Sequence, residues 1–176
     1  MKKNRKLIQV VILVAALLIG GISIGATLAD GKKVRVKEGG PPPDFNLSQL
    51  EGGSKQLADY KGKPLIINFW GTFCEPCVTE MPEFERQYQK WKDQGLEIAA
   101  INLRGENTLT ITKFVESLDL SYNILRDVDS KTEKMYGVRQ YPTTYFVKPD
   151  GNVMEIVSGP MTEKDIEERV VRLLQQ

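Results

Sequence analysis

The stretch that decides the fold of this chain is Phe69-Trp70-Gly71-Thr72-Phe73-Cys74-Glu75-Pro76-Cys77, which holds both cysteines of the protein. An apolar run of strand type, 65–70, leads into the pair, and a pattern of helix type follows it. A Cys-x-x-Cys pair at a strand-to-helix junction is typical of thiol–disulfide exchange. The free N–H groups and the positive end of the helix dipole stabilise the thiolate of the first cysteine. A structural disulfide or half of a metal site is the alternative interpretation.

The composition narrows the chemistry that this pair can support. The 176 residues include two cysteines and no histidine. Zinc sites of the Cys/His type, haem ligation by His and Ser-His-Asp triads are therefore excluded. Two cysteines also cannot form a four-cysteine zinc site within the chain. We expect no metal and no cofactor, with the Cys74–Cys77 disulfide as the redox-active group.

Charge is distributed unevenly along the chain. The tail 1–6 has a net charge of +4, whereas 44–176 carries 16 basic and 21 acidic residues, a net charge of −5. Domains that bind nucleic acid gather Lys and Arg on one face to neutralise phosphates. The acidic balance of 44–176 therefore predicts that the chain does not bind nucleic acid.

Residues 7–29 form an uncharged, strongly apolar segment. A helix of this length reaches roughly 34 Å, which is enough to cross the hydrocarbon core of a bilayer. A cleaved signal peptide has a shorter apolar region of about 7–15 residues, so we favour an uncleaved transmembrane signal anchor, although Thr27-Leu28-Ala29 fits a cleavage site. The basic tail 1–6 is expected to stay in the cytoplasm, with the long following domain on the extracytoplasmic side of the cell membrane.

A linker over 30–43 and a globular domain over 44–176 follow this segment. The linker ends in Gly39-Gly40-Pro41-Pro42-Pro43, which favours a short polyproline II spacer. Hydrophobic periodicity and turn residues in the domain predict, in order, a hairpin of 45–48 and 55–57, a strand over 64–70, a helix from 77 to about 94, a strand over 96–103, helices over 108–118 and 131–136, strands over 143–147 and 153–157, and a last helix capped by Thr162. This order predicts an α/β fold with a central mixed sheet, helices on both faces and an N-terminal β-hairpin, preceded by one transmembrane helix.

Several motifs occur in a fixed order over about 41–174. They are Pro43-Asp44-Phe45, Lys61-Gly62-Lys63-Pro64, the stretch from Asn68 to Cys77, Glu80-Met81-Pro82, Gly137-Val138 and Tyr141-Pro142-Thr143-Thr144. In these motifs the chain resembles the thioredoxin superfamily and, within it, the membrane-anchored ResA/TlpA-like thiol-disulfide oxidoreductases of cytochrome c maturation. The resemblance implies a thioredoxin-like fold. The family usually has Trp where this chain has Phe73, and we expect altered packing there without loss of the chemistry.

The resemblance also implies roles for the two cysteines. Cys74, at the helix start, is the nucleophile and the more exposed sulfur, and Cys77 is the buried resolving thiol. Cys74 attacks a substrate disulfide to give a mixed disulfide, and Cys77 then attacks Cys74 and releases the reduced substrate. Glu75 and Pro76, which lie between the cysteines, are expected to support the site.

The run Tyr141-Pro142-Thr143 looks like the cis-proline loop of this family. A cis bond between Tyr141 and Pro142 directs the backbone of Tyr141 outward beside Cys74, so that an extended substrate pairs with it. The alternative is an ordinary trans-Pro at a strand start, because only about 5–6% of X–Pro bonds are cis.

Glu80 is the candidate proton acceptor for Cys77. In thioredoxin-like proteins a buried acid often has this role, and its usual strand position is occupied here by Asn68, which does not ionise. Glu80 lies one turn beyond Cys77 and roughly 60° around the helix from it. As in the family that this chain resembles, Glu80 is expected to take and return the Cys77 proton. The alternative is a solvated acid in the first turn, favoured by the helix dipole.

The charges near the cysteines predict the direction of electron flow. Glu75 lies between them and Glu80 nearby, while no Lys, Arg or His neighbours them in sequence. Negative charge opposes thiolate formation and therefore favours the disulfide form of this protein. A pair that prefers to be oxidised donates its electrons to other proteins, so we expect a reductant.

The leading interpretation is a membrane-tethered, extracytoplasmic thiol-disulfide reductase. The resemblance implies that it reduces the haem-binding Cys-x-x-Cys-His disulfide of apocytochrome c, and that a membrane thiol transporter of the CcdA type re-reduces it. Another envelope or spore thiol pathway is the alternative client. A thiol peroxidase is less favoured because that class uses a single peroxidatic Cys with supporting Thr and Arg. A copper-delivery domain is less favoured because its family versions add a His ligand.

Overall fold

The structure is a computed structural model that describes residues 12, 14 and 36–176. The predicted basic tail, 1–6, and all but two residues of the predicted membrane segment, 7–29, lie outside the described residues. Among the residues that are described, no helix is long and apolar enough to cross a membrane.

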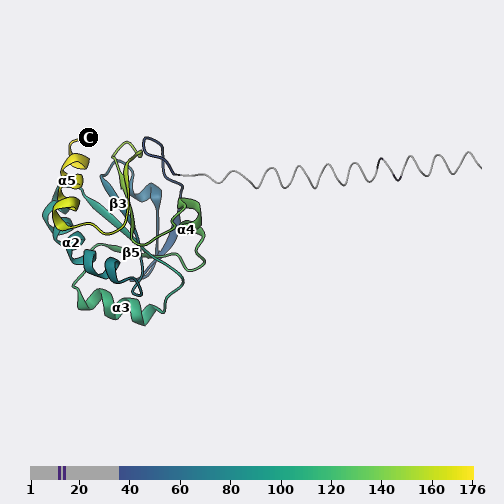
Figure 1. Cartoon of the computed structure of the whole chain (residues 1–176), viewed down its shortest axis with the longest axis horizontal. Helices are drawn as coiled ribbons and strands as arrows, with labels where there is room; N and C mark the ends of the chain where they lie inside the picture. The colour runs from purple at the N-terminus through teal and green to yellow at the C-terminus, as the bar shows by residue number, and fades with distance from the viewer. Residues whose placement is uncertain (1–11, 13, 15–35) are drawn as a thin grey trace, which may run out of the picture. The chain divides into compact units, whose positions relative to one another are not determined.

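A seven-stranded mixed sheet forms the centre of the globular domain (Figure 1). Its strands are β1 (Asn46–Gln49), β2 (Ser54–Gln56), β3 (Leu65–Trp70), β4 (Glu97–Asn102), β5 (Asn123–Arg126), β6 (Thr143–Val147) and β7 (Val153–Ser158). They lie side by side in the order β2-β1-β5-β4-β3-β6-β7. The strands β3, β4 and β5 are parallel, whereas β6, β7 and the β1–β2 hairpin pair antiparallel with their neighbours. The predicted mixed sheet and N-terminal hairpin are confirmed.

Helices cover both faces of this sheet, as predicted (Figure 1). They are the α-helices α2 (Glu75–Trp91), α3 (Thr108–Ser117), α4 (Lys131–Tyr136) and α5 (Glu163–Leu174), and the short 3-10 helices η1 (Leu57–Tyr60) and η2 (Lys92–Gln94). The inward residues of α2, α3 and α5 share one apolar core, and those of α4 and η1 share another. The disulfide lies in the first of these cores.

Strand β3 is buried along its whole length, which explains why its sequence is a continuous apolar run. Side chains alternate between the two faces of a strand. Ile66 and Trp70 therefore enter the core under α2, while Ile67 and Phe69 enter the core under α4. Asn68 shares the face of Ile66 and Trp70, so its amide lies under α2.

Strand β5 is missing from the order predicted from the sequence. Its four residues contain two apolar side chains, Ile124 and Leu125, between the polar Asn123 and Arg126. A run this short has no measurable periodicity. The strand forms because β4 and β1 pair with it on either side, and this long-range information is absent from the local pattern.

The described part of the segment expected to be a linker, 30–43, is attached to the edge of the sheet. Its hydrogen bonds to β7 run from Gly39 N–H to Val153 O (2.8 Å), from Val153 N–H to Gly40 O (2.9 Å) and from Ile156 N–H to the Glu38 carboxylate (3.0 Å). Ordered contacts with the sheet thus begin ahead of residue 44, where the domain was expected to start.

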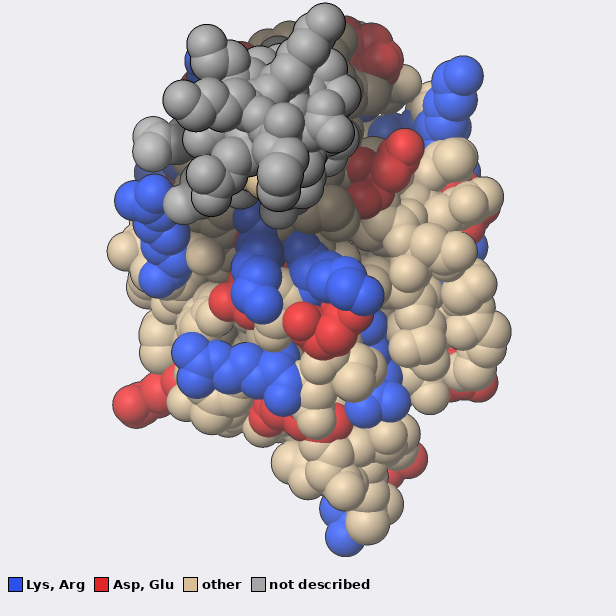
Figure 2. Space-filling model, turned by 90° about the vertical axis from the view of Figure 1, so that its right-hand side faces the viewer, with Lys and Arg blue, Asp and Glu red and all other residues tan. Residues whose placement is uncertain are grey.

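The surface on the α4 side of the domain carries charges of both signs. Figure 2 shows Lys and Arg side chains across the middle of this face, with Asp and Glu side chains between and around them. Lys131 of α4, for example, lies 2.5 Å from the Asp129 carboxylate. Interspersed charges partly cancel one another's field.

Candidate active site

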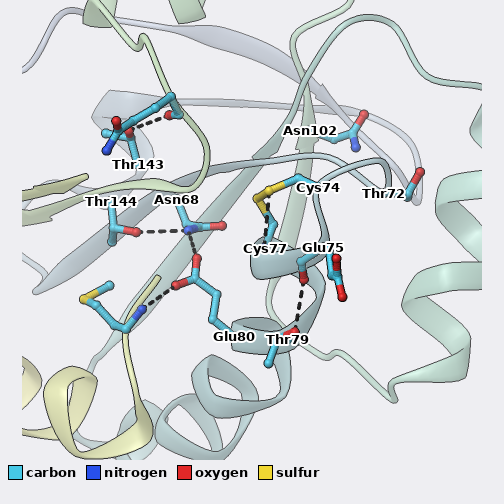
Figure 3. Close-up of a disulfide and its surroundings, with 12 residues drawn as sticks. Asn68, Thr72, Cys74, Glu75, Cys77, Thr79, Glu80, Asn102, Thr143 and Thr144 are labelled. Atoms are coloured by element: carbon cyan, nitrogen blue, oxygen red, sulfur yellow. Dashed lines mark hydrogen bonds between the residues drawn. A yellow bond between two sulfur atoms is a disulfide. The ribbon is translucent and has the colours of Figure 1, made fainter. Parts of the chain in front are cut away.

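Cys74 and Cys77 form a disulfide at the N-terminus of α2 (Figure 3). Cys74 is the N-cap residue, and its sulfur accepts a hydrogen bond from Cys77 N–H (3.3 Å). Pro76 lies in the first turn, where its missing N–H leaves no helical hydrogen bond unmade. Cys74 is 7% exposed and Cys77 is fully buried, which is the predicted order of exposure. The nucleophile and resolving roles stay predictions.

Gly71 lies in the turn from β3 into α2, directly under the Phe73 ring. Cys74 N–H donates to Gly71 O (3.1 Å) and closes the turn. A Cβ atom on Gly71 would lie 2.3 Å from the Phe73 ring. Because that separation is far below van der Waals contact, only glycine lets the Phe73 ring fold back over residue 71.

Glu80 lies on the inward face of α2 and is 1% exposed. One carboxylate oxygen accepts from Asn68 Nδ2 (3.0 Å) and the other from Met161 N–H (3.2 Å). Asn68 Nδ2 also donates to Thr144 Oγ1 (3.0 Å), so the amide bridges Glu80 and β6 (Figure 3). The alternative interpretation of Glu80 as a solvated acid is therefore wrong.

Burial raises the pKa of Glu80 to about 7, although the hydrogen bonds from Met161 and Asn68 act in the opposite direction. A carboxyl group with this pKa gains and loses a proton readily at neutral pH, which suits general acid–base chemistry. Asn68 Oδ1 is a buried acceptor without a hydrogen-bond partner among the described atoms.

A groove of about 310 Å³ runs along the surface beside the disulfide. It is lined by the start of α2 and the loop before α5, namely Glu75, Pro76, Thr79, Glu80, Pro160 and Met161. Glu75 and Pro76 are exposed in it, whereas Glu80 is almost fully buried. The groove therefore lies over the start of α2 and reaches Glu80. A larger groove, of about 460 Å³, lies between β1 and α4 and contains none of these residues.

The predicted loop Tyr141-Pro142-Thr143 lies next to the active-site turn. The Tyr141–Pro142 bond is cis, as predicted. The Tyr141 ring packs edge-on against Phe73, with 5.9 Å between ring centroids, and its hydroxyl donates to Glu133. Thr143 is buried and its hydroxyl donates to Gln140 O (2.8 Å), so this side chain supports the loop.

Arg104, in the loop between β4 and α3, is a site residue that the sequence did not indicate. Its guanidinium lies 4.8 Å from the Phe73 ring centroid and 5.3 Å from that of Tyr141. The pKa of Tyr141 is raised by burial and by its hydrogen bond to Glu133, and Arg104 opposes that increase. No Lys, Arg or His neighbours the cysteines in the sequence. The fold nevertheless places the Arg104 guanidinium over Phe73, the residue before Cys74. No motif or spacing rule connects the two segments.

Comparisons with known proteins agree with this fold. The model of the AhpC/TSA family matches residues 39–156. The chain is 40% identical over 171 residues to the thiol-disulfide oxidoreductase ResA of Geobacillus thermodenitrificans, with 97% of each chain covered. It is 38% identical over 167 residues to the ResA of Bacillus subtilis, with 94% of this chain and 92% of the relative covered. A solved structure from Chlorobium tepidum, described as a thiol:disulfide interchange protein DsbE, superposes with a TM-score of 0.74 at 26% identity, covering 79% of this chain and 99% of that one.

Proposed function

Because this chain belongs to the AhpC/TSA family and is a thiol-disulfide oxidoreductase of the ResA type, we propose that it reduces the haem-binding Cys-x-x-Cys-His disulfide of apocytochrome c. The observation that carries the chemistry is the Cys74–Cys77 disulfide at the start of α2, with the buried Glu80 one turn further along the helix. The choice of client rests on the resemblance to oxidoreductases of cytochrome c maturation.

The reaction follows from the arrangement of the two sulfurs. In the dithiol form, the Cys74 thiolate attacks one sulfur of the substrate disulfide, and the other substrate sulfur leaves as a thiolate that takes up a proton. Cys77 then gives its proton to Glu80 and attacks Cys74 in the mixed disulfide, which releases the second substrate thiolate. Two electrons pass from the enzyme dithiol to the substrate, and the enzyme is left as the disulfide that the structure shows.

The burial of Cys77 is the reason that this second step requires a base. A fully buried thiol has little access to water as a proton acceptor, and burial disfavours its thiolate. Glu80 has a pKa of about 7, so it is able both to accept the Cys77 proton and to return it at neutral pH. The groove beside Glu80 then provides the route by which this proton exchanges with solvent.

We place the enzyme outside the cytoplasm, held at the cell membrane by 7–29 with its N-terminus inside. A membrane thiol transporter of the CcdA type is the proposed electron donor. The reducing direction is supported by Glu75 and Glu80 on the groove side of the disulfide. Arg104 partly offsets these negative charges, since it lies over Phe73. Arg104 packs on the aromatic rings of Phe73 and Tyr141. We therefore keep the proposal that this protein acts as a reductant.

Trapping the mixed disulfide tests this proposal. Reduced Cys77→Ser protein, which cannot resolve the adduct, is expected to form a stable mixed disulfide with an oxidised apocytochrome c. The matched Cys74→Ser protein keeps one thiol as well, but the buried one, and is expected to form none. Adducts are separated without reductant and identified by mass. Absence of this adduct, together with normal cytochrome c in cells that carry Cys74→Ser, would contradict the proposed client.

A further inference from the structure

The loop between β4 and α3 is fixed against the loop that carries the disulfide. The Glu106 carboxylate accepts hydrogen bonds from Thr72 N–H (3.0 Å) and from Asn102 Nδ2 (2.6 Å). Leu103 N–H donates to Trp70 O (3.1 Å), which ties the start of the loop to the end of β3. Arg104 lies between these anchor points and is therefore held close to the active-site turn.

The backbone of Arg104 adopts a left-handed conformation that is costly for a residue with a side chain. Its φ angle is 59°, and that of Gly105 is 58°. This conformation is unfavourable for a residue other than glycine, because its Cβ atom lies too close to the following carbonyl oxygen. Glycine is required at position 105, where a Cβ atom would lie 3.0 Å from Val128 O. At position 104 glycine would suit the backbone equally well, so the presence of arginine indicates a use for its side chain.

The Arg104 side chain forms a platform with Phe73 and Tyr141. Its guanidinium lies over both rings, and the hydrogen bond to Glu133 holds the Tyr141 ring in place. Phe73 is 48% exposed, although it is large and apolar. Within the described residues, no carboxylate forms an ion pair with Arg104. The platform therefore presents a positive charge and an apolar ring to solvent directly before Cys74.

We propose that this platform binds a carboxylate side chain of the substrate polypeptide close to its reacting cysteine, which makes Arg104 a specificity-determining residue. A guanidinium that stacks on aromatic rings keeps the N–H donors at its edges, where they match the two oxygens of a carboxylate. Its contacts with both rings restrict its position before binding, so less side-chain entropy is lost when a carboxylate binds.

Two opposite charges near the disulfide also influence the direction in which a substrate lies. Glu75 is exposed in the groove at the start of α2 and repels an acidic side chain. Arg104 attracts it at the platform. A substrate with an acid on one side of its disulfide is therefore expected to bind in a single orientation. This inference rests on thiol–disulfide exchange at Cys74, and it does not depend on apocytochrome c as the client.

The experiment uses two disulfide-bonded peptides that differ only in Glu or Gln next to the reacting cysteine and that lack a haem-binding motif. The reduced full-length enzyme is expected to react with the Glu peptide about five- to tenfold faster than with the Gln peptide at low salt. The difference should nearly vanish at about 0.5 M salt, because Arg104 is exposed. Arg104→Gln should abolish the preference, so that the variant reacts with the two peptides at equal rates.

Control variants separate recognition from other effects of the substitution. Arg104→Gly suits a φ of 59° and keeps the fold, so it should lose the preference as Arg104→Gln does. Lys164→Gln removes an exposed cation on α5 and should leave the preference for the Glu peptide unchanged. The pH dependence of Cys74 alkylation is compared between wild type and Arg104→Gln. It shows whether Arg104 acts on the ionisation of the Cys74 thiol instead of on the substrate. Equal wild-type rates for the two peptides, or equal slowing of both by Arg104→Gln, would overturn the proposal. Neither result bears on whether apocytochrome c is the client.

Discussion

The buried carboxyl of Glu80 makes the stability of the oxidised protein depend on pH in a defined direction. Its pKa rises from the ordinary 4.5 to about 7 on folding, chiefly because of burial. The folded state therefore binds more protons than the unfolded state between these values, so the free energy of unfolding falls as pH rises through this window. At 1.36 kcal/mol for each pH unit, the contribution lost from about pH 4.5 to above pH 7 is about 3 kcal/mol.

Glu80→Gln removes this ionisation, and the unfolding free energies of the two oxidised proteins test the reasoning. The stability of the variant relative to wild type is expected to increase by about 3 kcal/mol between about pH 4.5 and pH 8, whatever constant offset its altered hydrogen bonds introduce. Denaturant titrations at several pH values measure this difference. Glu168→Gln, which removes a carboxylate that is 62% exposed on α5, should follow the wild-type curve. Parallel curves for wild type and Glu80→Gln would refute a raised pKa at Glu80.

Two further predictions concern the charge and the turn at the site. Glu75→Gln combined with Glu80→Gln should raise the reduction potential, because fewer negative charges oppose the thiolate, on a scale of about 30 mV per 1.4 kcal/mol. Potentials against a glutathione buffer at about pH 8 measure this, and unchanged values would remove the electrostatic account of the reducing direction. Gly71→Ala places a Cβ atom 2.3 Å from Phe73 and should displace its half-exposed ring. The unfolding free energy should change by less than about 1 kcal/mol, whereas the peptide preference that depends on the ring should weaken. An unchanged peptide preference would show that the ring does not need this space.

The local pattern predicted the parts of the fold that depend on local physics. The apolar run of β3, the Cys-x-x-Cys pair at the start of α2 and the capping of α5 by Thr162 are all encoded within a few neighbouring residues. The helical period also placed Glu80 on the inward side of α2.

Contacts between residues that are far apart in the chain could not be predicted from the local pattern. The hydrogen bond from Met161 to Glu80, the bridge from Asn68 to Thr144 and the pairing of β5 depend on how the sheet and the loop before α5 assemble. The approach of Arg104 to Phe73 is a contact of the same kind. The local signal for Arg104 is its place beside Gly105 in a turn after a buried strand. Many loops share this pattern, so it does not indicate a contact with Phe73.

The strip 38–40 along β7 has a consequence for the exposed edge of the sheet. An edge strand presents unpaired N–H and C=O groups that recruit any extended polypeptide. In this domain the outward backbone groups of Val153 are already bonded to Gly39 and Gly40, and Ile156 N–H is bonded to Glu38. The edge at β7 is thereby protected from pairing with another extended polypeptide, including a second copy of this chain.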